Sequence, residues 1–232
     1  MVTCYDAAYA VLCQEAGIDV LLVGDSLANA CLGYRNTAEI GMPEMLHHTA
    51  AVRRGSSQAR VVSDFPFGAD ATVELALENG RALVAAGADA VKLEGAKIDQ
   101  VKALVVVGIP VVGHLGLLPQ TATSLKQAGR DPEEAERIRA DALALEDAGA
   151  CAVVLEHIPS DLASSITRSL KIPTIGIGAG PGCSGQVLVL HDMLGLSARR
   201  PPFARAFGEL RQATLQALGD YAKAVREGSF PA

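Results

Sequence analysis

The 232-residue sequence has no tryptophan, no CxxC pair and no cluster of basic residues. No apolar run approaches the ~20 residues that a membrane span needs. A formal net charge of −6 without a basic cluster argues against nucleic acid or an anionic membrane as a partner. The first residues lack the pattern of a secretory signal, and the five cysteines form no paired framework. We therefore expect a cytoplasmic protein with reduced thiols.

The sequence is rich in apolar segments that end in ionisable side chains. Half of its residues are hydrophobic. The segment 20–23 is uncharged and is followed by Gly24, Asp25 and Ser26. Such a run is typical of a strand that is buried on both faces in a parallel sheet. Asp25 then lies where the strand leaves the core, which is where α/β proteins bind ligands.

Four further segments repeat this arrangement. The apolar runs at 60–64, 90–94, 109–114 and 151–156 each carry at least one ionisable group at or near the end. In chain order these groups are Asp64, then Lys92 and Glu94, then His114, and then Glu156. We expect the carboxyl ends of these strands to share one edge of the fold, so these side chains should lie close together.

Helical segments separate the predicted strands, giving about eight strand–helix units. We predict strands over 2–4, 20–23, 60–64, 90–94, 109–114, 151–156, 173–177 and 187–190. Predicted helices span 6–15, 43–54, 72–86 and 98–107, then run from 131 to the glycine at 149, from 160 onward, and over 203–226. The clearest start is Asp131, which is followed by Pro132 and acidic residues typical of a helix N-terminus.

This order predicts a single (β/α)8 barrel over residues 1–232, with a C-terminal helical tail at about 203–227. The length fits, because such barrels commonly have roughly 200–250 residues. The alternative is an open doubly wound sheet. In that fold the chemistry would gather at one switch point instead of appearing on nearly every strand.

The acidic residues at neighbouring strand ends point to a cation. Asp25 and Asp64 would repel each other unless a cation lies between them. Together with Glu94 they offer only oxygen ligands, which suit Mg²⁺. The alternative is that these carboxylates cap helices or pair with nearby arginines.

The other ionisable groups each have a functional and a structural interpretation. Lys92 and Glu94 leave their strand on the same face, so the anionic partner of Lys92 is either a substrate carboxylate or Glu94. His114 is either a donor or acid–base group, or a satisfied core residue. Apolar surroundings should raise the pKa of Glu156, as a proton acceptor requires; otherwise it forms a salt bridge.

The glycine-rich segment 176–180 resembles a backbone cradle for an anion, although tight packing is the commoner explanation for a glycine-rich turn. His47, His48 and His191 receive no role.

Several motifs in order resemble the ketopantoate hydroxymethyltransferase family, and the resemblance extends over essentially the whole chain. The motifs are Leu22-Val23-Gly24-Asp25-Ser26-Leu27, Asp64-Phe65-Pro66-Phe67, Val91-Lys92-Leu93-Glu94-Gly95, Gly113-His114-Leu115-Gly116-Leu117 with Pro119-Gln120, and Ile175-Gly176-Ile177-Gly178-Ala179-Gly180.

The resemblance implies a Mg²⁺-dependent barrel enzyme of the phosphoenolpyruvate/pyruvate superfamily, active in pantothenate synthesis. It would transfer a hydroxymethyl group from 5,10-methylenetetrahydrofolate to 3-methyl-2-oxobutanoate, giving 2-dehydropantoate, and would form a homo-oligomer. By position, the implied roles are metal ligands for Asp25 and Asp64 with Glu94 in the outer shell, substrate binding for Ser26, Lys92 and His114, and the base for Glu156.

The sequence departs from the family pattern in three places. It begins almost at the first strand, where the family usually has a helical segment that is often used in subunit assembly. The loop 121–130 after Gln120 is shorter than the family's, which places folate binding in question. The connection after Ser26 also differs, at 27–29 and at 37–40. Two alternatives are therefore kept. One is a related Mg²⁺-dependent enzyme of the phosphoenolpyruvate mutase or isocitrate lyase type, although no cysteine-containing loop follows the fourth strand. The other is a non-catalytic binding protein.

Overall fold

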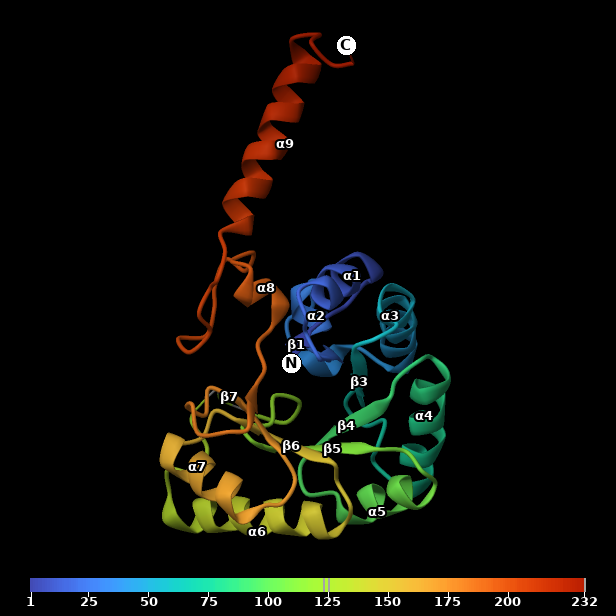
Figure 1. The fold of residues 1–232 in the computed structure, drawn as a ribbon, viewed down its shortest axis with the longest axis vertical. Helices are drawn as coiled ribbons and strands as arrows, with labels where there is room; N and C mark the ends of the chain where they lie inside the picture. Colours follow the sequence, from blue (N-terminus) through green and yellow to red (C-terminus); the bar gives the residue numbers. More distant parts are fainter. Residues whose placement is uncertain (123, 125, 232) are drawn as a thin grey trace. The chain divides into compact units, whose positions relative to one another are not determined.

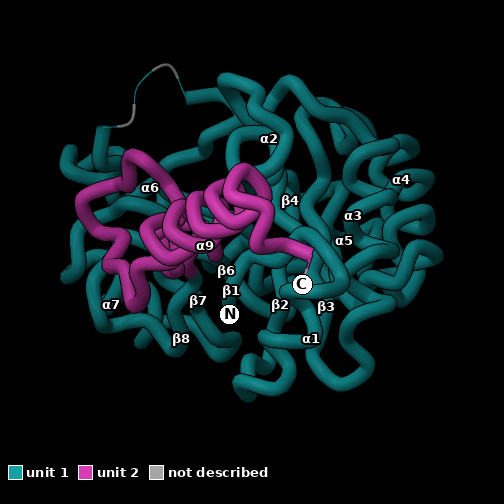
Figure 2. Tube along the Cα trace, turned by 90° about the horizontal axis from the view of Figure 1, so that it is seen from above, with its two compact units in different colours: residues 1–187 teal, residues 188–232 magenta. Residues whose placement is uncertain are grey.

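The computed structural model describes residues 1–122, 124 and 126–231. They form two compact units, residues 1–187 and 188–232, which Figure 2 colours separately. Among the described residues, no helix is both long enough and apolar enough to cross a membrane.

The first unit is built on eight parallel strands that follow one another in chain order. The amino group of Met1 donates to the carbonyl of Gln186 at 3.2 Å, which links the first strand to the last. The predicted (β/α)8 barrel is confirmed. The strands are β1 (Val2–Thr3), β2 (Val20–Val23), β3 (Arg60–Asp64), β4 (Ala90–Glu94), β5 (Val111–Gly116), β6 (Ala152–Glu156), β7 (Thr174–Ile177) and β8 (Gly185–Gln186).

Helices alternate with the strands, and Figure 1 shows α4 to α7 on the outside of β4 to β7. The stretch 27–42, between the predicted strand 20–23 and the predicted helix 43–54, contains a short helix and a 3₁₀ turn. The helices of this unit are α1 (Ala7–Glu15), α2 (Leu27–Ala30), α3 (Met42–Gly55), α4 (Val73–Ala85), α5 (Ile98–Val106), α6 (Pro132–Asp147) and α7 (Ser160–Ser169), with the 3₁₀ turn η1 at Thr37–Glu39.

Side-chain caps fix the starts of three of these helices. Asp6 accepts from the Tyr9 backbone N–H at 2.8 Å, and Thr72 accepts from that of Leu75 at 3.2 Å. Asp131 accepts from two backbone N–H groups of the first turn of α6, as its position before Pro132 predicts. Each bond satisfies a donor that a helix leaves unpaired at its N-terminus.

The strands share one apolar layer. Strand side chains alternate between the two faces, so one position per strand can point to the same cluster. The buried members of this cluster are Leu22, Val62, Ala90, Val112, Val154 and Val187. Because helices cover the other face of the sheet, the strands must be apolar on both sides, and this explains their continuous hydrophobic runs.

The last strand lies earlier in the chain than predicted. β8 is Gly185–Gln186, not 187–190, and it pairs with Ile175 and Gly176. Val187 still donates its N–H to the carbonyl of Gly176 at 2.9 Å. The apolar residues that follow lead into a short helix, α8 (Leu190–Met193). A short apolar run does not by itself distinguish a strand from a buried helix.

The second unit contains α8 and the long helix α9 (Leu210–Arg226). The predicted helical tail is present, but its predicted start at 203 is wrong, because α9 begins at Leu210. In the preceding segment, the Phe207 N–H donates to the carbonyl of Met193 at 2.8 Å. The Leu210 N–H likewise donates to the carbonyl of Leu194 at 2.9 Å, so the backbone bonds of this segment go to α8 and the turn after it.

Gly55 tests the packing of α1 against α3. A Cβ atom added there would lie 2.2 Å from the Ala7 carbonyl oxygen, a backbone atom that has little room to move. We expect Gly55→Ala to lower the free energy of unfolding by about 1–3 kcal/mol, measured by urea unfolding. Gly219→Ala in α9 is the control, because nothing lies within 4 Å of its added Cβ. An equally stable Gly55→Ala protein would contradict the close α1–α3 contact.

Candidate functional site

The ionisable side chains form a second layer directly above the apolar one. Asp64, Lys92, His114 and Glu156 each lie two residues after a member of the apolar cluster on the same strand. Two residues along a strand return to the same face. These side chains therefore share one face at the carboxyl ends of β3 to β6, as the sequence predicts.

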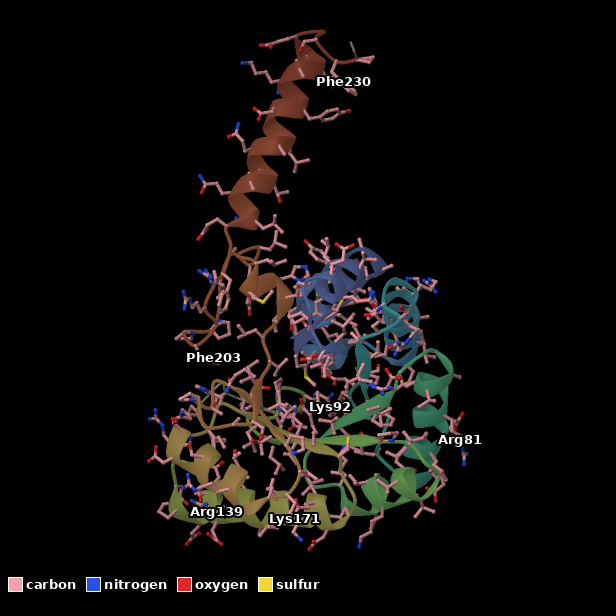
Figure 3. The ribbon with its side chains drawn as sticks, viewed as in Figure 1. Arg81, Lys92, Arg139, Lys171, Phe203 and Phe230 are labelled. Carbon is pink, nitrogen blue, oxygen red and sulfur yellow. The ribbon has the colours of Figure 1, made fainter. Side chains whose placement is uncertain are left out.

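Asp64 contacts both Lys92 and Asp25, each through a different carboxylate oxygen. Its Oδ1 atom lies 3.1 Å from Lys92 Nζ, and the two residues are register partners across β3 and β4. Its Oδ2 atom accepts from the backbone N–H of Asp25 at 3.1 Å. The partner of Lys92 (labelled in Figure 3) is thus Asp64, not Glu94, the protein partner considered from sequence.

His114 lies between Lys92 and two carboxylates. Its Nδ1 atom is 3.4 Å from Lys92 Nζ and 3.6 Å from Glu94 Oε1, and its Nε2 atom is 3.1 Å from Glu156 Oε2. A lysine ammonium only donates, so Nδ1 must accept. The neutral ring then carries its proton on Nε2, the atom that faces Glu156. β5 continues to Gly116, so His114 lies inside this strand and not at its end.

Ser26 is held by a residue that was not assigned to the site from sequence. Its Oγ atom is 2.9 Å from the hydroxyl of Tyr5, whose side chain is buried. Ser26 precedes α2, but its hydroxyl makes no capping bond there. Tyr5 lies far from Ser26 along the chain, and no local pattern in the sequence indicates this contact.

Gln120 is a second residue that the sequence reasoning missed. Its side-chain Nε2 donates to Asp25 Oδ2 at 2.8 Å and to the carbonyl of Phe65 at 2.9 Å. Its backbone N–H donates to Glu94 Oε2 at 3.2 Å. Gln120 belongs to one of the family motifs, and this was the only signal available.

Burial dominates the electrostatics of the acidic groups. It raises the pKa of Asp25, raises that of Asp64 to about 7 and raises that of Glu94 to about 8, and Lys92 opposes all three shifts. Burial lowers the pKa of Lys92, but Asp64, Asp25 and Glu94 outweigh this and the net shift is upward. Burial and then Lys92 lower the pKa of His114. Three buried carboxyl groups thus face one lysine.

This donor set fits a hard cation that keeps part of its own water. The described residues hold no ready-made group of three or more His, Cys, Asp and Glu ligands. Mg²⁺ does not require one, since one or two carboxylates with waters and substrate oxygens are enough. Apart from its ion pair, the buried Oδ1 atom of Asp64 accepts no hydrogen bond from the described residues. Asp25 and Asp64 could therefore share such an ion.

The glycine-rich segment after β7 is explained by packing. A Cβ added at Gly180 would lie 2.2 Å from Ser160 Oγ, and one at Gly182 would lie 1.9 Å from Ser164 Oγ. Both serines belong to α7. These glycines let the segment approach the helix, which supports the packing explanation over an anion cradle.

His48, which received no role from the sequence, makes a structural contact. Its Nδ1 atom lies 2.6 Å from the carbonyl oxygen of Tyr5.

The family model and the curated relatives that match this chain all describe the same enzyme family. Residues 1–232 match the family model described as ketopantoate hydroxymethyltransferase. Proteins named 3-methyl-2-oxobutanoate hydroxymethyltransferase from a Cyanothece strain and from Moorella thermoacetica are 50% and 52% identical to it. Each comparison covers 100% of this chain, and 92% and 89% of the respective relative.

Solved structures with a similar fold are much more distant in sequence. A phosphonopyruvate hydrolase, crystallised with oxalate and Mg²⁺, has a TM-score of 0.68 and 14% identity, covering 98% of this chain and 82% of that one. A 2,3-dimethylmalate lyase, described as a member of the PEP mutase/isocitrate lyase superfamily, has a TM-score of 0.63 and 17% identity, with 98% and 82% covered. At these identities the likeness shows the fold alone.

The raised acid pKa values predict how stability depends on pH without a divalent cation. Folded Asp64 and Glu94 have pKa values of about 7 and about 8, against ordinary values of 3.8 and 4.5. His114 does not alter this trend above pH 6.5. Its pKa is 6.5 in the unfolded chain and lower in the folded state, so it is largely neutral in both states above that pH. From there to about pH 8 the folded state therefore holds protons that the unfolded state has lost, so the free energy of unfolding should fall.

Urea unfolding across this pH range, with a chelator present, measures the trend. Glu94→Gln removes the group that titrates last and should flatten the slope. A free energy of unfolding that rises with pH over this range would contradict the assignment.

Proposed function

Because this chain belongs to the ketopantoate hydroxymethyltransferase family, we propose that its buried ionisable layer is the site that enolises 3-methyl-2-oxobutanoate. Family membership makes the chain a hydroxymethyltransferase, and the product of that reaction belongs to pantothenate synthesis. The observation that carries the proposal is the meeting of Asp64, Lys92, His114 and Glu156 on one face at the carboxyl ends of four neighbouring strands.

In this proposal the 2-oxo acid is held through its oxygens. Lys92 and Ser26 bind the carboxylate, since one supplies a positive charge and the other a hydroxyl donor. His114 donates its Nε2 proton to a substrate oxygen. The ion pair with Asp64 and the contact with Tyr5 keep the first two side chains in place before substrate arrives.

Asp25 and Asp64 would hold Mg²⁺, with Glu94 bonding to its water. Such an ion would act as a Lewis acid that makes the C–H bond next to the ketone more acidic. Oxygen donors and the excess of buried carboxyl groups over Lys92 support this assignment. Both Mg²⁺ and the roles of these residues belong to the proposal.

Glu156 would remove the proton from C3. Its side chain is 17% exposed, so it is reachable, and it faces the Nε2 proton of His114. The electron pair of the C3–H bond then forms the enolate, and the lysine charge stabilises it where it develops. C3 next attacks the one-carbon unit of 5,10-methylenetetrahydrofolate. The carbon of this unit must lose both of its bonds to folate nitrogens: water adds to it and the two hydrogens of the water go to the two nitrogens, which releases formaldehyde. The C3 electron pair forms the new C–C bond to the formaldehyde carbon, and the carbonyl oxygen takes the proton held by Glu156 to become the hydroxyl group.

The donor is expected to approach over the loop that follows β5. A cavity of about 500 Å³ is lined by residues of this loop and its surroundings, including Leu117, Thr121 and Lys126. Thr123 and Leu125 of the shortened loop lie outside the described residues. Assembly as a homo-oligomer and a cytoplasmic location also stay predictions.

The alternative chemistry of the phosphoenolpyruvate mutase type is less well supported. The solved structures of that superfamily share the barrel at 14–17% identity, whereas the hydroxymethyltransferases are about 50% identical over the full chain. A non-catalytic role would also leave a destabilising cluster of buried charges without a purpose.

Proton–deuterium exchange at C3 of 3-methyl-2-oxobutanoate tests the proposed base without any folate. Glu156→Gln should lower the Mg²⁺-supported exchange rate by about 10²–10⁴-fold, because the amide cannot accept the proton. Glu133→Gln, at an exposed position of α6, is the control and should exchange like the wild type. Full exchange by a folded Glu156→Gln protein would remove Glu156 from the role of base.

Removal of the metal tests the acidic pair. We expect a chelator to abolish the same exchange and Mg²⁺ to restore it. Asp25→Asn and Asp64→Asn should each weaken Mg²⁺ binding, measured by calorimetry, by more than about tenfold. Asp161→Asn, on the exposed side of α7, controls for loss of a carboxylate elsewhere. Binding of equal strength in all four proteins would contradict a metal centre at this position.

A further inference from the structure

Gln120 is a polar residue that bonds to two of the buried carboxyl groups of the site, those of Asp25 and Glu94. It lies in the loop after β5 and is held to three neighbouring segments at once. Its three hydrogen bonds reach Asp25, the carbonyl of Phe65 after β3, and Glu94 at the end of β4. These bonds hold the loop against two acidic residues, Glu94 on β4 and Asp25, which follows β2.

The side-chain amide of Gln120 can take only one orientation here. Its nitrogen carries two hydrogens, and both acceptors within reach are oxygens, one a carboxylate and one a backbone carbonyl. Turning the amide over would place its own oxygen against both of them. Asp25 Oδ2 is therefore held by a donor with a fixed direction.

This contact constrains which oxygen of Asp25 is left for other ligands. Oδ2 is engaged by Gln120, and the backbone N–H of the same aspartate donates to Asp64 Oδ2. The chain of contacts therefore fixes both carboxylates relative to each other. Outer partners of this kind orient the ligands of metal sites.

We propose that Gln120 is a positioning residue for cation binding, which holds Asp25 through Oδ2 and turns Oδ1 toward the ion shared with Asp64. The inference rests on the proposed metal role of Asp25 and Asp64. The opposite role would be a placeholder, in which the amide occupies the place of the ion and must leave when it binds. The bond to Phe65 favours the positioning role, because it anchors the amide to a backbone carbonyl outside the acidic pair.

The two roles predict opposite changes in affinity, which calorimetric titration of the metal-free protein with Mg²⁺ distinguishes. Gln120→Met keeps the length of the side chain but cannot donate. We expect it to bind Mg²⁺ about 10–100-fold more weakly than the wild type. We also expect C3 exchange to recover at saturating Mg²⁺, with the half-saturating concentration raised by the same factor. A purely structural role would not give this recovery.

Gln127→Met is the matched control. Gln127 belongs to the same loop, and its side-chain oxygen accepts from Arg130 Nε at 2.8 Å, without a bond to the acidic groups. Its Mg²⁺ affinity should equal that of the wild type. Gln120→Ala is the second variant, to be used if the methionine variant unfolds at a lower temperature than the wild type.

The outcomes separate this inference from the metal centre itself. Equal or tighter Mg²⁺ binding by the folded Gln120 variants would overturn the positioning role, and tighter binding would indicate a placeholder. A wild-type protein that binds no Mg²⁺ would overturn the metal centre and the role of Gln120 together. Weaker Mg²⁺ binding by the Gln120 variants, with unchanged binding by the Gln127 control, would support the positioning role of Gln120.

Discussion

The burial of three carboxyl groups around one lysine is the constraint on which the rest of this site depends. Asp25, Asp64 and Glu94 are buried, with exposed fractions of 7%, 2% and 7%, and Lys92 is the buried cation that faces them. Charges in a protein interior are stable only when they are paired and hydrogen-bonded. The pairing of Asp64 with Lys92 across β3 and β4 meets part of this requirement. The remaining acids keep raised pKa values, so the site has a surplus of negative charge that suits a cation.

The barrel places this unfavourable layer on top of a favourable one. Each of the four strands β3 to β6 contributes an apolar residue and then, two positions later, an ionisable one on the same face, as in Val62 followed by Asp64. The apolar layer stabilises the barrel by removing hydrocarbon from water. The strand ends can then carry groups that burial disfavours, because the layer below them holds the strands in register. On these strands the earlier, apolar residue stabilises the fold, and the later, ionisable residue belongs to the proposed site.

Much of this arrangement can be predicted from the sequence, because it follows from local patterns. The uncharged runs before Asp25 and Asp64 predict buried parallel strands, and Asp131 before Pro132 predicts the start of α6. What could not be predicted depends on contacts between distant segments. Gln120 reaches Asp25 through a loop whose path no periodicity encodes, and Tyr5 meets Ser26 only after β1 and β2 pair. The last strand was misplaced because Val187 and the residues after it are apolar enough for a strand or a helix.

The sequential strand order has a consequence for how the protein is synthesised. All seven assigned site residues lie between positions 25 and 156, so they leave the ribosome before β7 and β8 do. Chains emerge at about 5–20 residues per second, slowly enough for local strand pairs to form first. Asp64 and its cationic partner Lys92 belong to the neighbouring strands β3 and β4, so they emerge within the same segment. An incomplete chain could in this way already hold its charged layer while the barrel is still open.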